Sequence, residues 1–98
     1  MNTRAILIAF LLWPWLSSAQ STFPPEVTRF VEGRDSCDHF RGEEPYDAER
    51  RKFLEDRMRE LCTGTDRRLK ALRLKYKREP KVLSKLNEYE PQIEAASK

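Results

Sequence analysis

Two cysteines in a short, highly charged chain limit what this sequence can fold into. The chain has 98 residues, and its only cysteines, Cys37 and Cys62, enclose the segment CDHFRGEEPYDAERRKFLEDRMRELC. The same segment holds the only histidine, His39, so it fits three interpretations: a metal site, a catalytic site or a covalent cross-link. These interpretations imply different proteins, and the compartment in which the chain folds helps to separate them.

The first 19 residues have the layout of a secretory signal peptide. One cation, Arg4, precedes an apolar run over residues 5–16, and small residues follow up to Ala19. A membrane span needs about 20 apolar residues, and this run is shorter. We therefore expect cleavage after Ala19, with a short anchoring helix that is never removed as the alternative. The mature chain, 20–98, is expected to be secreted or periplasmic, without a transmembrane segment.

Export favours a disulfide bond between the two cysteines. The mature chain of 79 residues is long enough for one small domain only, and a domain of this size often needs a covalent cross-link. In an oxidising compartment two cysteines are more often paired than free. We therefore predict a disulfide between Cys37 and Cys62. In the chain-entropy model it raises the free energy of unfolding by about 3.5 kcal/mol.

Apolar residues recur at helical spacing in the first half of the mature chain. The first stripe consists of Phe23, Val27, Phe30, Arg34 and Cys37. Gly42 and Pro45 then disfavour a continuing helix, so RGEEPY is a break. Asp47 is a suitable N-cap for a second helix. The apolar face of that helix carries Leu54, Met58, Leu61 and Cys62. Because both cysteines lie on such stripes, they can meet where the two helices pack together.

The second half shows the same periodicity. Gly64 is a stop signal and Thr65 a new N-cap. The third helix carries Leu69, Leu72 and Tyr76, and the fourth, from Pro80, carries Val82, Leu86, Tyr89 and Ile93. Pro91 kinks or splits the end of the fourth helix. The sequence therefore predicts an all-α fold, a small disulfide-stapled bundle of three to four short helices in one domain, 20–98, with 20–25 and 91–98 loosely ordered.

The residue types do not favour metal binding or catalysis. Zinc usually takes four ligands at spacings such as C-x2-C, whereas Cys37, His39 and Cys62 are three candidates at unsuited spacing. A cysteine nucleophile needs a free thiolate, which a disulfide removes. Paired carboxylates such as Glu43 and Glu44 usually form a solvated surface in a chain with 36% charged residues. We expect no enzyme, no metal and no cofactor.

Charge is unevenly distributed along the mature chain. Residues 20–62 carry eight Lys and Arg against eleven Asp and Glu, whereas residues 63–98 carry ten against five. The basic density is highest in DRRLKALRLKYKREPK, residues 66–81. This segment fits a solvated helix face paired with the acidic half, a docking surface for an acidic partner or polyanion, or a nucleic-acid site. Export and a single aromatic residue, Tyr76, argue against nucleic acid.

The segment LCTGTDRRLKALRLKYK resembles part of the LprI-like lysozyme-inhibitor family of small exported bacterial proteins. In that family a cysteine precedes a short break, an aspartate, and leucines that lead to a tyrosine. The corresponding residues here are Cys62, Asp66, Leu69, Leu72 and Tyr76, with Cys37 as the upstream cysteine. The resemblance covers residues 37–76 and implies a disulfide-linked helical domain that inhibits lysozyme.

This sequence also departs from the family pattern. The gap between the cysteines is longer than usual, and Arg73 stands where an acidic residue commonly follows the second leucine. The segment DHFRGEEPYD lies outside the pattern and resembles small exported bacterial proteins with no assigned role. A lysozyme inhibitor is expected to offer an acidic patch to a cationic enzyme, and only the half up to Cys62 qualifies.

Two functional hypotheses follow. In the first, the chain is an exported non-enzymatic binding protein that engages a protein partner in the cell envelope or outside the cell, for example as an inhibitor of a cell-wall hydrolase. Its contact residues would be Glu43, Glu44, Tyr46 and Asp47. The alternative is a structural envelope protein that associates with polyanions, such as a polyanionic glycan, through the basic helix 66–81. Its contact residues would be Arg67, Arg68, Lys70 and Arg73.

Overall fold

The structure, a computed structural model, describes residues 22–96, and all regular structure in this range is helical. The helices are α1 (Pro25–Arg41), α2 (Ala48–Cys62), α3 (Thr65–Lys75), α4 (Pro80–Leu86) and α5 (Ile93–Ala96). This confirms the predicted all-α class. The expected signal peptide, 1–19, lies outside the described residues. None of the helices within 22–96 is long and apolar enough to cross a membrane.

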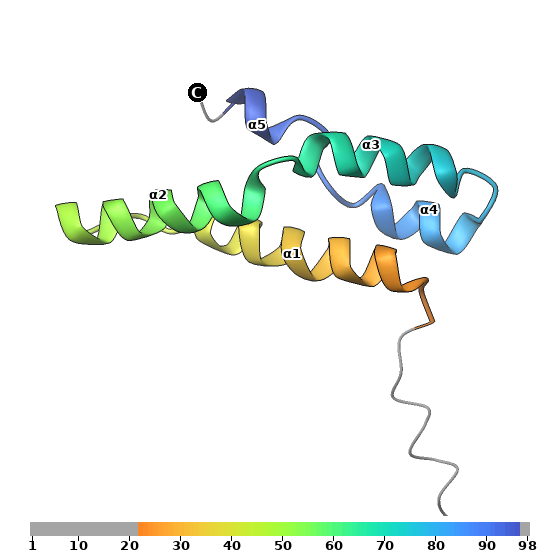
Figure 1. The fold of residues 1–98 in the computed structure, drawn as a ribbon, viewed down its shortest axis with the longest axis horizontal. Coiled ribbons are helices and arrows are strands. Elements are labelled where there is room, and N and C mark those ends of the chain that lie inside the picture. Colours follow the sequence, from red (N-terminus) through yellow and green to blue (C-terminus); the bar gives the residue numbers. More distant parts are fainter. Residues whose placement is uncertain (1–21, 97–98) are drawn as a thin grey trace, which may run out of the picture.

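The helices α1 and α2 run in opposite directions but overlap along only part of their lengths (Figure 1). The connection after Gly42 continues away from α1, so the first turns of α2 extend beyond the end of α1. The helices α3 and α4 lie against the other half of α1. We call α1, α3 and α4 the body, and residues 43–60, which pack against the last turns of α1, the arm.

The main core lies in the body. Its buried residues come from α1, α3, the turn after α3, and α4: Val27, Phe30, Leu69, Leu72, Tyr76, Val82 and Leu86. Leu54 of α2 is also buried but lies outside this cluster. Ile93 of α5 is buried too. The loose order expected for 91–98 stays a prediction, although the side chain of Ile93 is covered.

The disulfide between Cys37 and Cys62 is present, as predicted. The two Cα atoms are 5.2 Å apart, and Cys37 is fully buried on the stripe of α1. The bond joins α1 to the last residue of α2, where the arm meets the body. It uses both thiols that the metal and nucleophile interpretations would require.

Most predicted helix boundaries are confirmed. The Asp47 side chain accepts a hydrogen bond of 2.7 Å from the backbone N–H of Arg50, as an N-cap does. The predicted fourth helix is too long: α4 ends at Leu86, so Tyr89 lies outside it, and Ile93 begins a separate helix, α5, after Pro91. The basic segment 66–81, however, is not one helix. It contains most of α3, a turn and the start of α4, because the residue before a proline is disfavoured in the α conformation and Glu79 is extended (φ −115°, ψ 96°).

The predicted N-cap at Thr65 is wrong. The N-cap of α3 is Gly64, whose φ of 84° is left-handed and suits glycine. Thr65 is the first helical residue, and its buried hydroxyl accepts a hydrogen bond from Arg34. The amides of Gly64 and Asp66 donate instead to the carboxylate of Glu94, 3.0 and 2.9 Å away. A cap supplied from a distant part of the chain replaces the local one.

Gly33 lies inside α1, and replacing it with alanine is expected to stabilise the fold. A Cβ atom at this position would meet nothing within 4 Å. Glycine inside a helix costs about 0.5–1 kcal/mol relative to alanine, because it loses more backbone entropy on folding. We expect Gly33→Ala to raise the free energy of unfolding in urea by that amount. A lower unfolding midpoint would show that the position needs glycine for another reason.

Candidate functional site

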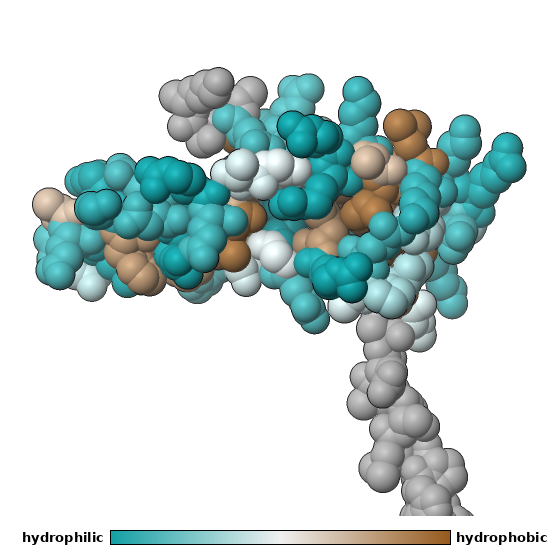
Figure 2. Space-filling view, viewed as in Figure 1, coloured by the Kyte–Doolittle hydropathy of each residue, from teal (hydrophilic) through white to brown (hydrophobic). Residues whose placement is uncertain are grey.

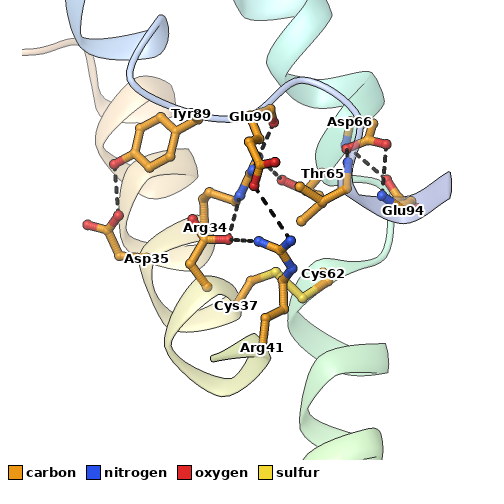
Figure 3. Close-up of polar contacts among 12 residues, drawn as sticks. Arg34, Asp35, Cys37, Arg41, Cys62, Thr65, Asp66, Tyr89, Glu90 and Glu94 are labelled. Atoms are coloured by element: carbon orange, nitrogen blue, oxygen red, sulfur yellow. Dashed lines mark hydrogen bonds and ion pairs between the residues drawn. A yellow bond between two sulfur atoms is a disulfide. The ribbon is translucent and has the colours of Figure 1, made fainter. Parts of the chain in front are cut away.

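The buried arginine of α1 links three segments of the chain. Arg34 is 2% exposed. Its Nε donates to the Asp38 carboxylate (3.0 Å), Nη1 to the Thr65 hydroxyl (3.3 Å) and Nη2 to the backbone carbonyl of Glu90 (2.8 Å). Figure 3 shows Thr65, at the start of α3, and Glu90, in the segment before α5, on the guanidinium side of Arg34. Arg34 therefore joins α1 to the start of α3 and to the segment before α5.

Tyr89 covers the same guanidinium. Its ring centre is 5.5 Å from Cζ of Arg34, and its hydroxyl donates to the Asp35 carboxylate at 2.8 Å (Figure 3). Burial raises the pKa of the Tyr89 phenol, and the hydrogen bond to Asp35 raises it further. Tyr89, in its neutral form, thus belongs to a structural network with Arg34 and Asp35.

Two helix starts cap each other beside this network. The Glu94 carboxylate accepts from the amides at the start of α3, and the Asp66 carboxylate accepts from the amides of Ile93 and Glu94, both at 3.0 Å (Figure 3). The hydrogen bonds from the amides of Asp66 and then Gly64 lower the pKa of Glu94 below its usual value. This reciprocal cap fixes α5 to α3.

The lowered pKa of Glu94 predicts an acid-sensitive contribution to stability. A carboxyl whose pKa is lower in the folded state stabilises the fold above its unfolded pKa, near 4.5, and this stabilisation is lost as the pH falls through the folded pKa. We expect Glu94→Gln to lower the free energy of unfolding by about 1 kcal/mol at pH 7. Below pH 4 the difference between variant and wild type should shrink. Urea unfolding at both pH values measures it.

A matched control is available on α2. Glu55 is exposed and makes no ion pair with the other described residues. Glu55→Gln removes the same charge, so it should leave stability at pH 7 within about 0.5 kcal/mol of the wild type. A Glu94→Gln variant with the same acid dependence as the wild type would contradict the cap.

The predicted protein-binding residues lie together in the loop of the arm, but two of them are engaged in hydrogen bonds within the arm. Glu43 is bound to Nε of Arg50 at 2.6 Å, and this hydrogen bond lowers the pKa of Glu43. Asp47 caps α2. Glu44 is exposed, and Tyr46 is 79% exposed. The hydrogen bonds of Glu43 and Asp47 thus fix the loop, and the side chain of Tyr46 is exposed.

A second aromatic residue extends this surface. Phe53 of α2 is 42% exposed, with the Arg50 guanidinium 4.7 Å from its ring centre and the Phe40 ring 6.0 Å away, edge to face. Tyr46, Arg50 and Phe53 line the same shallow hollow. In Figure 2 the arm end is mainly hydrophilic, with small apolar patches between charged groups.

The predicted polyanion-binding residues are divided between two faces of α3. Arg67, Lys70 and Arg73 line one hollow, whose apolar lining includes Leu74 and Pro91. Leu74 is 62% exposed. Arg68 lines a different hollow, beside α1, and donates to the carbonyl of Thr63. The structure therefore groups three of the four residues, which we call the α3 basic face.

The cations of α1 and α2 form ion pairs more often than those of the basic segment 66–81. Within 22–96, six cations of α1 and α2 form ion pairs with nearby acids: Arg34, Arg41, Arg50, Lys52, Arg57 and Arg59. In the basic segment 66–81 only Lys75 does so, with Glu26. Ion pairing with the acidic half therefore involves one cation of this segment, and the three residues of the α3 basic face form no ion pair with another described residue.

No metal-binding cluster is formed by the described residues, since no three His, Cys, Asp or Glu side chains of 22–96 are grouped to hold an ion. His39 is exposed, and its ring contacts Phe40 edge to face, 5.1 Å between centres. Sequence reasoning missed the partners of Arg34, although an arginine within an apolar stripe was a signal that polar partners would be needed.

No protein-family model, curated protein or solved structure matches this chain.

Proposed function

We propose that this protein is an exported, non-enzymatic binding protein that associates with anionic polysaccharide through the α3 basic face. The observation that carries this proposal is that Arg67, Lys70 and Arg73 line one hollow and form no ion pair with another residue of 22–96. Most cations of α1 and α2 are neutralised by neighbours, whereas these three are available to an anionic ligand. Exposed charges of one sign attract a polyanion over about 10 Å at moderate salt.

The hollow also suits the apolar faces of sugar rings. Leu74 and Pro91 give it an apolar surface, and the three cations line the same hollow. Carboxylate or sulfate groups along a polysaccharide can then pair with the guanidinium and ammonium groups. The exposed Arg68, Lys77, Arg78 and Lys81 add to the positive field around this site.

Salt-dependent retention tests the proposal. Mature protein, 20–98, is applied to immobilised dextran sulfate and eluted with a salt gradient. We expect the triple variant Arg67→Gln/Lys70→Gln/Arg73→Gln to bind on the order of ten-fold more weakly at physiological salt. The matched control, Arg51→Gln/Lys52→Gln/Arg59→Gln on α2, has the same net charge and should lose much less. If the two variants elute at the same salt concentration, net charge alone explains the retention, and the proposal is contradicted.

A second candidate function is protein binding by the arm, as an inhibitor or partner of a cell-wall hydrolase. The specific observation in its favour is the exposure of two aromatic side chains, Tyr46 at 79% and Phe53 at 42%. Aromatic residues are frequent anchors of protein interfaces. The exposed Glu44 beside them suits a cationic enzyme.

Inhibition of lysozyme tests this second function. Wild-type protein at micromolar concentration should slow the lysis of cell walls by lysozyme, and Tyr46→Ser/Phe53→Ser should abolish the effect. The α3 triple variant serves as the control and should inhibit like the wild type. An unchanged rate of lysis with the wild-type protein would remove the hydrolase as the partner.

A further inference from the structure

A second hollow lies between α1 and α3, separate from the α3 basic face. Its volume is about 460 Å³, within the range of small-molecule sites. Phe30 and Leu72 contribute apolar wall, and Thr65 and Arg34 contribute polar groups. None of its lining residues belongs to the hollow of the α3 basic face. We refer to it as the α1–α3 cleft.

The absent side chain of Gly33 keeps part of the cleft open. Gly33 lines it from the middle of α1, and a Cβ atom built at this position would meet nothing within 4 Å. The space therefore lies directly over the helix backbone. The Cβ atom of a larger residue at 33 would therefore begin in open space.

The charge of the cleft is positive. Arg29, Arg34 and Arg68 line it together with one acid, Glu26. Asp38 offsets the charge of Arg34, so the positive charge comes from Arg29 and Arg68. Glu26 is already engaged, because it forms an ion pair with Lys75 and accepts a hydrogen bond from the Tyr76 hydroxyl. Arg29 makes no ion pair within the described part of the chain, and Arg68 donates only to a backbone carbonyl.

Arg34 adds a buried donor to these exposed cations. A guanidinium has five N–H groups, and the three hydrogen bonds of Arg34 to Asp38, Thr65 and Glu90 use three of them. Two N–H groups therefore have no acceptor among residues 22–96. The side chain of Arg34 is nine-tenths or more buried and lines the cleft beside Thr65. A buried donor of this kind is stabilised by an anionic acceptor.

We propose that the α1–α3 cleft binds a small organic carboxylate with an apolar body. The carboxylate is held by Arg29 and Arg68 at the opening and by the spare donors of Arg34, and the apolar body lies against Phe30 and Leu72 over Gly33. Guanidinium groups match carboxylates in shape and charge. The proposal is independent of polysaccharide binding, because it uses other residues.

Nuclear magnetic resonance titration of the mature protein tests this proposal. Benzoate is the probe, and benzamide is its neutral analogue of similar size. We expect saturable shifts of the Gly33 amide and of the Arg34 Nε–H with benzoate, and at least ten-fold weaker binding of benzamide. Inorganic phosphate, which lacks an apolar body, should also bind at least ten-fold more weakly. Equal binding of benzoate and either comparison compound, or no saturable shift, overturns the proposal.

Two variants locate the site. Gly33→Leu fills the cleft and should weaken benzoate binding at least ten-fold without lowering the melting temperature, because leucine favours a helix more than glycine does. The control Ser36→Leu places the same side chain on an exposed position of α1 outside the cleft and should bind like the wild type. Arg29→Gln/Arg68→Gln should weaken benzoate binding ten-fold. The control Arg51→Gln/Arg59→Gln removes the same charge from α2 and should not have this effect. Unchanged affinity in Gly33→Leu overturns the assignment.

Discussion

Removing the disulfide is expected to lower the free energy of unfolding by about 3.5 kcal/mol in the double variant Cys37→Ser/Cys62→Ser. The bond spans a sequence separation of 25 residues, so it restricts the unfolded chain strongly. It also joins α2 to α1 outside the main core cluster. Because a domain of this size has a total stability near 5 kcal/mol, the double variant should be close to unfolding at 37 °C.

Urea unfolding of the mature protein, followed by circular dichroism, measures this effect. A reducing agent should destabilise the wild type to the level of the double variant and should leave the double variant unchanged. Ser36→Ala, next to Cys37 but exposed, is the matched control and should unfold like the wild type. An unfolding midpoint that does not change on reduction would mean that the helices are held without the bond.

Arg34→Ala is expected to destabilise the fold by about 3 kcal/mol. The substitution leaves a cavity where a large buried side chain had been, and it removes the hydrogen bonds to Thr65 and to the Glu90 carbonyl. Asp38 loses one of its two arginine partners but keeps Arg41, 2.8 Å away, and is partly exposed. The loss therefore comes mainly from the cavity and from the two buried acceptors.

Arg34→Met separates these two contributions. Methionine fills much of the volume but donates no hydrogen bond, so we expect a loss of about 1–2 kcal/mol. The control Arg51→Ala removes an exposed arginine from α2 and should cost less than about 0.5 kcal/mol. If the alanine and methionine variants unfold at the same urea concentration, hydrogen bonding alone accounts for the role of Arg34. If Arg34→Ala matches Arg51→Ala, the buried network contributes nothing.

Local signals predicted the local structure well. The helical stripe that includes Arg34 and Cys37 is the buried face of α1, and Asp47 caps α2. The disulfide followed from two cysteines in a chain whose first 19 residues we expect to be an export signal. Each of these features depends on residues that are close in sequence or on the redox state of the compartment, so the sequence alone carries the information.

Long-range polar contacts could not be predicted in this way. Arg34 binds Thr65 and Glu90, 31 and 56 positions away, and Glu94 caps α3 from 30 positions beyond Gly64. The helix boundary at Thr65 was assigned from local capping preferences and was wrong for this reason. The division of Arg68 from Arg67, Lys70 and Arg73 depends likewise on how α3 packs against α1.

The position of the disulfide also determines what a protease can do to this molecule. The exposed connection between α1 and α2, with Glu44 and Tyr46, offers a point of attack for a protease. Hydrolysis there would divide the backbone into two fragments, yet the bond between Cys37 and Cys62 would keep them as one covalent molecule. The main core would also keep its partners, because it combines α1 from one fragment with α3 and α4 from the other.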